Sequence, residues 1–219
     1  MPDPYVSPFA WRYGSSTMRE VWSEKTKRLL WRKIWVALAK VQCHYDIVTS
    51  AQVEDLVAHQ EDVDLEHSLA IEAEIHHDLM AEVHAYAEQC PIGGGIIHVG
   101  ATSMDIKDNA IVLQMRRALD LTMPMLETLL ATFAEQIKTW ADTPCMGFTH
   151  LQPAEPTTIG YRLAGYAQDL LEDYRALQRL HTELRGKGFK GAVGTSASYA
   201  TLLAGVKGCP SPAAFEAAV

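Results

Sequence analysis

Apolar residues recur at intervals of three and four along most of this 219-residue chain, the spacing that places them on one face of an α-helix. The predicted helices are residues 23–48, 50–59, 66–89, 103–140, 156–185 and 197–206. Proline and glycine clusters at 91–95 and 186–194 separate them. No alternation of apolar and polar residues predicts a strand. The pattern therefore predicts an all-α fold.

The segment 103–140 stands out by its length, roughly 55 Å at 1.5 Å per residue. Pro124 lies inside it and is expected to kink it, because proline lacks an N–H and clashes with the preceding turn. Helices of this length are typical of bundles, often bundles that pack across subunits. We therefore expect an N-terminal helical domain over residues 1–108 and an incomplete long-helix bundle over 109–219.

Composition narrows the class of protein. Hydrophobic residues make up 48% and charged residues 21%, as in ordinary globular proteins. The net charge of −8 argues against a nucleic-acid-binding surface. No apolar run approaches the length of a membrane span, and the N-terminus has no signal pattern. Four scattered cysteines form no zinc or redox motif. We expect a cytoplasmic protein that contacts neither nucleic acid nor membrane.

One loop carries the strongest chemical signal. His150 stands between Thr149 and Leu151-Gln152-Pro153, in a segment with two prolines beside a predicted long helix. A neutral imidazole takes a proton near pH 7 and an imidazolium gives one, so a His held by a rigid loop is a candidate acid or base. A lone loop histidine is more often a surface residue, but two loops of similar character, 97–103 and 191–198, strengthen the case for a functional role of His150. No metal site is expected, since the adjacent His76 and His77 would diverge on a helix.

Five segments, in this order, resemble the fumarase/aspartase superfamily and, within it, the adenylosuccinate lyase family. The family run Thr-His-Leu-Gln-x-Ala-x-Pro-Thr-Thr is similar to 149–158, and His-x-Gly-Ala-Thr-Ser stands at 98–103. An Arg-Tyr-x-Ser-x-x-Met start resembles 12–18, and a His-Asp-x-Met run resembles 77–80. The glycine-rich loop at 191–198 completes the set. The resemblance covers residues 9–205 and implies a central bundle of five long helices, of which about two are found here.

The resemblance implies a chemistry: elimination of fumarate from adenylosuccinate, and from succinyl-aminoimidazole-carboxamide ribotide, in purine biosynthesis, without a cofactor. It implies that His150 is the general acid and that His77, near the substrate phosphate, orients it. It also implies substrate contacts at Arg12, Tyr13, Asp78, Thr102, Ser103, Thr149, Gln152, Arg162 and Ser196. The small-molecule substrate would bind in a homotetramer that builds each active site from three subunits.

Two departures from the family pattern leave the substrate open. Tyr161 stands where the family commonly has lysine, and Ser196 where the animal-type enzymes have glutamine. The family's catalytic base is a serine in a Gly-Ser-Ser-x-Met-Pro-x-Lys-x-Asn loop, and no such run occurs in the 219 residues. We therefore expect the chain to end before the family fold is complete, to be inactive alone, and to associate through unburied apolar helix faces.

Two alternatives remain at this point. The first is a non-catalytic helical scaffold that keeps the N-terminal half of a lyase. The second is a sibling lyase acting on another N-succinyl compound or on argininosuccinate. The pair Arg12 and Tyr13, which fits a phosphate-bearing ligand, argues against the sibling lyase.

Overall fold

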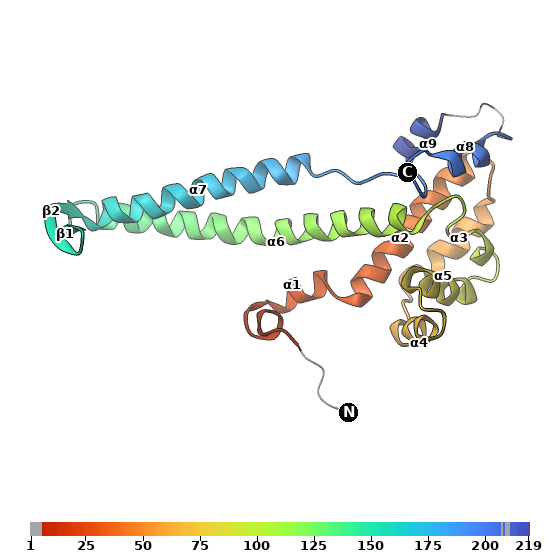
Figure 1. Ribbon diagram of the computed structural model, residues 1–219, viewed down its shortest axis with the longest axis horizontal. Coiled ribbons are helices and arrows are strands. Elements are labelled where there is room, and N and C mark those ends of the chain that lie inside the picture. Colours follow the sequence, from red (N-terminus) through yellow and green to blue (C-terminus); the bar gives the residue numbers. More distant parts are fainter. Residues whose placement is uncertain (1–5, 207, 209–210) are drawn as a thin grey trace. The chain divides into compact units, whose positions relative to one another are not determined.

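The computed structural model describes residues 6–206, 208 and 211–219 (Figure 1). Its helices are α1 (Ser16–Val21), α2 (Glu24–His44), α3 (Ser50–His59), α4 (Leu65–Ile75), α5 (Asp78–Gln89), α6 (Ser103–Thr139), α7 (Ile159–Glu183), α8 (Ala197–Leu203) and α9 (Pro212–Ala218). A π-helical turn, η1 (Phe9–Tyr13), and a 3₁₀ turn, η2 (Gly94–Ile96), complete the helical elements. Among the described helices none has the length and apolar character of a membrane span.

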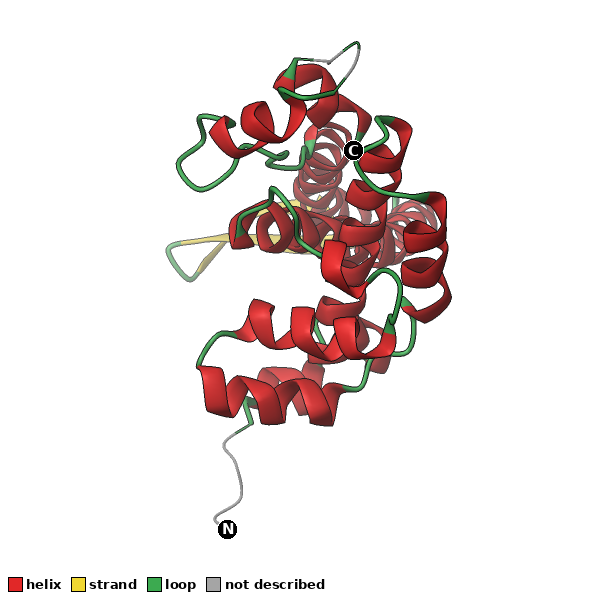
Figure 2. Cartoon of the chain, turned by 90° about the vertical axis from the view of Figure 1, so that its right-hand side faces the viewer, coloured by secondary structure: helices red, strands yellow, loops and turns green. Residues whose placement is uncertain are grey.

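The all-α prediction is confirmed for the architecture, and Figure 2 shows one small exception, the two strands drawn in yellow. Strands β1 (Pro144–Thr149) and β2 (Gln152–Thr158) pair antiparallel. The prediction of no strand is therefore wrong over these residues. Pro153 and Pro156 made the segment resemble a loop, but both strands of a two-stranded hairpin are edges, where missing N–H groups are tolerated.

The predicted helix over 66–89 is also corrected, because the structure divides it into α4 and α5. His76 adopts the left-handed conformation with φ +55°, and His77 is extended. The Nδ1 atom of His77 accepts a hydrogen bond from the Met80 N–H at 3.2 Å, so His77 caps α5 and does not lie within a helix. The sequence has no proline or glycine at this break, and the helical spacing of apolar residues continues across it. The pattern therefore predicted one helix instead of two.

Two compact units make up the chain, and each is described by itself. One comprises the residues up to 115 together with those from 185 onward, and the other comprises residues 116–184. Helix α6 contributes residues to both. The domain boundary expected near residue 108 stays a prediction.

The unit formed by the residues up to 115 and from 185 onward contains the hydrophobic core. Its centre is α2, whose Trp31, Trp35 and Leu38 are at most 1% exposed. Buried residues from α3, α5, α6, α8 and α9 surround them, namely Leu56, Leu79, Tyr86, Ile106, Ala110, Tyr199, Leu203 and Phe215. The core therefore gathers segments as distant in the sequence as α3 and α9 around one helix, which is the arrangement of a packed all-α unit.

Charged side chains are buried in the same unit. Arg28, Arg32 and Glu82 are each 0% exposed. The Nε atom of Arg32 lies 2.6 Å from Glu82 Oε1, and Arg28 Nη2 lies 2.7 Å from Glu72. Arg32 Nη1 also donates to the His59 carbonyl at 2.9 Å. These ion pairs connect α2 to α4 and α5. Removal of one member would leave a buried charge unpaired, so the network favours this one packing of the three helices.

The unit of residues 116–184 is a helical hairpin with little interior. Helix α7 returns beside α6 after the β-hairpin (Figure 1). The pairing is antiparallel, since His181 lies 2.7 Å from Asp120 and the Tyr174 hydroxyl donates to Glu127 at 2.5 Å. Of this unit's residues only Gly160 is buried. A Cβ atom there would lie 2.7 Å from the Ala141 Cα, so glycine permits the close approach of α7 to the end of α6.

Candidate active site

The β-hairpin holds His150 at its tip. Thr149 pairs with Gln152, so His150 and Leu151 form a two-residue turn, and both have positive φ, +50° and +63°. Two-residue hairpin turns usually place glycine or asparagine at such positions. A histidine and a leucine there are strained, and strained backbone gathers at functional sites. His150, Thr149 and Gln152 are all exposed, so the turn presents the imidazole to solvent or to a ligand.

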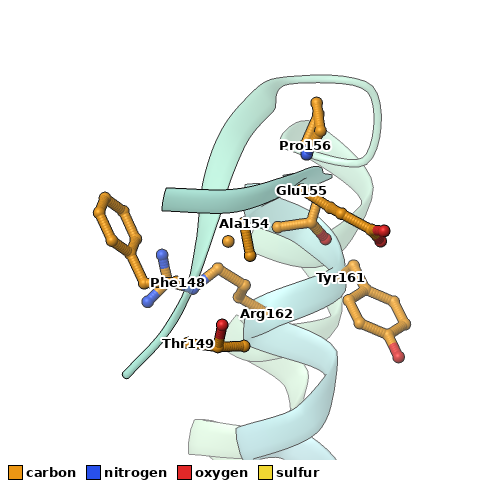
Figure 3. A pocket seen from close by; sticks show the side chains of 9 residues that line it. Phe148, Thr149, Ala154, Glu155, Pro156, Tyr161 and Arg162 are labelled. Atoms are coloured by element: carbon orange, nitrogen blue, oxygen red, sulfur yellow. The ribbon is translucent and has the colours of Figure 1, made fainter. Parts of the chain in front are cut away.

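A pocket lies beside this turn, between the hairpin and the start of α7 (Figure 3). It has a volume of about 880 Å³, and Thr149, Glu155, Tyr161 and Arg162 are among its lining residues. The Arg162 side chain extends from α7 toward Phe148 and Thr149. A guanidinium in an open pocket suits carboxylate or phosphate oxygens. Of the predicted site residues, the structure thus brings Thr149 and Arg162 together here.

The start of α7 is positioned by local contacts. The Thr158 hydroxyl accepts the Tyr161 N–H at 3.1 Å and so caps the helix. Gly160 N–H donates to the Trp140 carbonyl at 2.9 Å and Ile159 N–H to the Thr143 carbonyl at 3.0 Å. These bonds hold Arg162 one turn from the cap.

A second group of predicted residues lies in the other unit. The Asp78 carboxylate forms an ion pair with Lys107 at 2.7 Å and accepts the Leu79 N–H at 2.8 Å. Burial by itself raises the pKa of Asp78, but these two contacts outweigh it and leave the pKa below its ordinary value. His77 beside it uses Nδ1 to cap α5, and its side chain is exposed.

The loops that carry Thr102 and Ser196 are joined through a buried carboxylate, that of Asp105, which the sequence motifs did not single out. Asp105, which is 0% exposed, accepts the Thr102 N–H at 3.2 Å, the Gly191 N–H at 3.0 Å and the Tyr199 hydroxyl at 3.0 Å. It thereby joins the 98–103 loop to the glycine-rich 191–198 loop. Asp105 follows the 98–103 motif directly, but its partners Gly191 and Tyr199 lie 86 and 94 residues away in the sequence.

The 191–198 loop is itself shaped by unusual backbone. Ser196 has φ +57° and its N–H donates to the Lys190 carbonyl at 2.8 Å. The Ser198 hydroxyl donates to the Gly100 carbonyl at 2.8 Å. Burial, and then the neighbouring Asp105 charge, raise the pKa of Tyr199, so this phenol stays protonated and donates to Asp105. Two of the sequence motifs therefore form one hydrogen-bonded assembly.

Arg12 and Tyr13 form a separate N-terminal feature. Both lie in η1 and are exposed. The Arg12 guanidinium stacks over the Trp11 ring at 4.5 Å, and the Tyr13 ring lies 6.0 Å from that of Phe9. The stacking leaves the edge of the guanidinium, which carries its N–H donors, able to meet a phosphate.

Residues of metal-binding type do not gather in threes anywhere in the described part of the chain. In the 116–184 unit, an imidazole at His150 can transfer a proton and the Arg162 guanidinium can bind an anion. In the other unit, the Arg12 guanidinium and the hydroxyls of Thr102 and Ser103 are hydrogen-bond donors for an anion.

Comparisons with known proteins identify the family of this chain. A family model described as lyase matches residues 11–203. The adenylosuccinate lyase of Saccharomyces cerevisiae is 37% identical over 207 residues, which are 93% of this chain and 43% of that protein. The adenylosuccinate lyase of Pyrococcus abyssi is 38% identical over 196 residues, 89% of this chain and 44% of the relative. The chain thus spans less than half the length of these curated relatives.

Solved structures are similar over a comparable share. The 3-carboxy-cis,cis-muconate lactonizing enzyme from Pseudomonas putida has a TM-score of 0.81 and 31% identity, covering 88% of this chain and 45% of that one. A fumarate lyase from Mesorhizobium sp. BNC1 has a TM-score of 0.80 and 28% identity, covering 90% and 46%. These similarities cover less than half of each longer chain.

Proposed function

We propose that this chain, which belongs to the lyase family, supplies the acid and the substrate-binding segments of an enzyme that eliminates fumarate. The substrates would be adenylosuccinate and the related succinyl-aminoimidazole-carboxamide ribotide. The observation that carries the proposal is the strained His150 turn beside the Arg162 pocket, within the segment most similar to the family's histidine motif. The reaction would belong to purine nucleotide biosynthesis.

The proposed step is an anti elimination. A base removes a proton from the carbon beside a succinyl carboxylate, and the C–H electrons form the double bond of fumarate. The C–N electrons return to the departing nitrogen, which His150 protonates as general acid. Negative charge builds on the carboxylate in between, where fixed donors lower the barrier. We propose Thr149, Gln152 and Arg162 as such contacts from the hairpin and α7.

The remaining contacts are proposed from the other compact unit. Arg12 and Tyr13 would bind the phosphate and ribose end, Thr102 and Ser103 a carboxylate at the start of α6, and Ser196 a polar group of the substrate. His77, held at the head of α5, would orient the acid, and Asp78 would keep Lys107 and the start of α5 in place. The base, a serine in the family, would come from a segment outside these 219 residues.

We also propose a homo-oligomer, a tetramer in the assembled enzyme. Large apolar side chains in the 116–184 unit are exposed, among them Met125 at 72%, Tyr166 at 59% and Leu180 at 49%. Patches of this kind associate. Light scattering should show assemblies, and a monomer at all concentrations would contradict this part. A cytoplasmic location is proposed with it, supported by the unpaired Cys43, Cys90 and Cys145.

The experiment is the loss of adenylosuccinate absorbance, measured with this chain alone and with a fragment of a curated relative that carries the serine loop. Activity only with the fragment is the expected result. Activity of the chain alone would place the base within these residues. No activity either way, with no nucleotide binding by calorimetry, would favour a non-catalytic scaffold. Turnover of argininosuccinate instead would favour a sibling lyase.

A further inference from the structure

Helix α2 holds the loop at 98–99 with two buried side chains. The Trp35 indole Nε1–H donates to Nδ1 of His98 at 3.2 Å, and the Gln42 amide donates to the Val99 carbonyl at 2.9 Å. Trp35 and Gln42 are each 1% exposed and lie seven residues apart, two turns along one face of α2. The loop is held in an unfavourable conformation, since His98 has φ +71°.

The bond from Trp35 restricts the chemical state of the imidazole. An indole nitrogen only donates, so Nδ1 of His98 must accept and carries no proton. In the neutral ring the proton is then on Nε2. In an imidazolium both ring nitrogens carry protons, and the Nδ1–H would face the indole N–H. The hydrogen bond is therefore available only to the neutral form.

We infer that Trp35 is a positioning residue that holds His98 as the neutral Nε2–H tautomer, so that His98 offers a hydrogen-bond donor to a ligand rather than a proton. His98 is half-buried, and its Nε2 atom has no hydrogen-bond partner among the residues that the structure describes. A carboxylate, phosphate or carbonyl oxygen would suit this donor.

The surroundings of His98 agree with a neutral ring. Burial lowers the pKa of His98 most, the Asp105 carboxylate from α6 opposes this, and His77 at the head of α5 lowers the pKa further. The Asp105 charge is shared with the donors from Thr102, Gly191 and Tyr199, which limits its pull on the ring. The Trp35 ring lies 6.1 Å from the His98 ring, and the Tyr86 ring stacks on Trp35. Neither aromatic side chain adds a charge at neutral pH.

The consequence for the candidate site is a division of roles between two histidines. His150 would transfer the proton from the hairpin turn, while His98 would stay neutral and bind. This consequence rests on the proposed function, but the tautomer does not, and it can be measured on the chain without any substrate.

The test is a pH titration of the histidine-labelled chain by long-range ¹H–¹⁵N correlation spectra, with His98 assigned from a His98→Gln sample. We expect one protonated nitrogen, Nε2, and a midpoint below that of an ordinary histidine. Trp35→Phe keeps a ring in the core but removes the donor. It should raise the midpoint by roughly half to one pH unit and admit the other tautomer.

Trp31→Phe is the matched control. It removes an equally buried indole from the same helix, one turn earlier, where Lys27 and Arg28 lie over the ring. It should leave the state of His98 unchanged. A wild-type ring protonated on Nδ1 would overturn the inference, as would equal shifts in the two tryptophan variants.

A measurement on the wild type covers the case in which Trp35→Phe does not fold. The Trp35 indole N–H resonance should move with the same midpoint as His98, because the hydrogen bond ends when the ring gains its second proton. An indole resonance that is constant through the His98 titration would refute the inference. Neither result bears on adenylosuccinate turnover, so failure here and failure of the proposed function are distinguishable.

Discussion

The two compact units position their candidate residues by different means. In the unit formed by residues up to 115 and from 185 onward, buried side chains reach across helices: Trp35 to His98, Asp105 to Tyr199, Arg32 to Glu82. In the unit of residues 116–184 only Gly160 is buried, and the His150 turn is positioned by strand pairing, a helix cap and a close glycine contact. Tertiary contacts therefore determine the first group, and local backbone geometry determines the second.

The largest test of this contrast is the buried carboxylate. Glu82→Ala leaves Arg28 and Arg32 buried without their shared partner, which should cost about 3–5 kcal/mol in the free energy of unfolding. Urea unfolding followed by circular dichroism measures it. Glu127→Ala, in the exposed unit, removes only the partner of Tyr174 and serves as the comparison. Equal losses in the two variants would erase the distinction between the units.

A smaller effect is expected at the head of α7. Thr158→Ala removes the hydroxyl that accepts the Tyr161 N–H and should cost about 1 kcal/mol of stability. Because this cap precedes Arg162 by one turn, the same variant should weaken ligand binding in the pocket. Thr132→Ala, an exposed mid-helix hydroxyl bonded to the Thr128 carbonyl, is the control and should be neutral or slightly stabilising. Equal losses from the two threonines would show that the cap does not matter.

The Asp78–Lys107 pair predicts a pH dependence. The folded-state pKa of Asp78 lies below its ordinary value, so the unfolded chain binds the proton more readily. The stabilisation is present above the ordinary carboxyl pKa, about 4, and is lost as pH falls through the folded value. Lys107→Met should remove at most about 1 kcal/mol at pH 7, since the pair is partly exposed. The acid limb of the stability profile should become shallower, and an unchanged limb would count against the pair.

The smallest effect is expected from Tyr174→Phe. This substitution removes one exposed hydrogen bond to Glu127 across α6 and α7 and should leave the free energy of unfolding almost unchanged, because solvent competes for an exposed contact. Thermal unfolding at two salt concentrations would measure it. A loss approaching that of Glu82→Ala would mean that the helical hairpin depends on this contact far more than its exposure suggests.

Sequence patterns were sufficient where structure is local. The helix predicted at 50–59 agrees with α3, and the helix predicted at 103–140 agrees with α6 to within a residue. Patterns failed where the determinant is distant or conformational. The break at His76 carries no glycine or proline, the 144–158 hairpin contains prolines that indicate a loop, and Trp35 meets His98 across 63 residues.

The candidate site follows the same division. The resemblance singled out His150, Arg162 and Thr149, but not Asp105, because an aspartate near a helix start looks like an ordinary cap until its partners from the 190–199 segment are known. In the sequence, His98 is recognisable only as the first residue of the 98–103 motif. Its left-handed backbone and its indole partner, neither visible in a pattern, are what distinguish it.

The central claim is that His150, at the strained tip of the hairpin, is the general acid. The most direct measurement is adenylosuccinate turnover with the chain carrying His150→Ala, in the presence of the family's serine-loop segment and with circular dichroism as a check on folding. The account predicts a loss of roughly 10²–10⁴ in turnover with helicity intact. Near-normal turnover of a folded His150→Ala chain would contradict it.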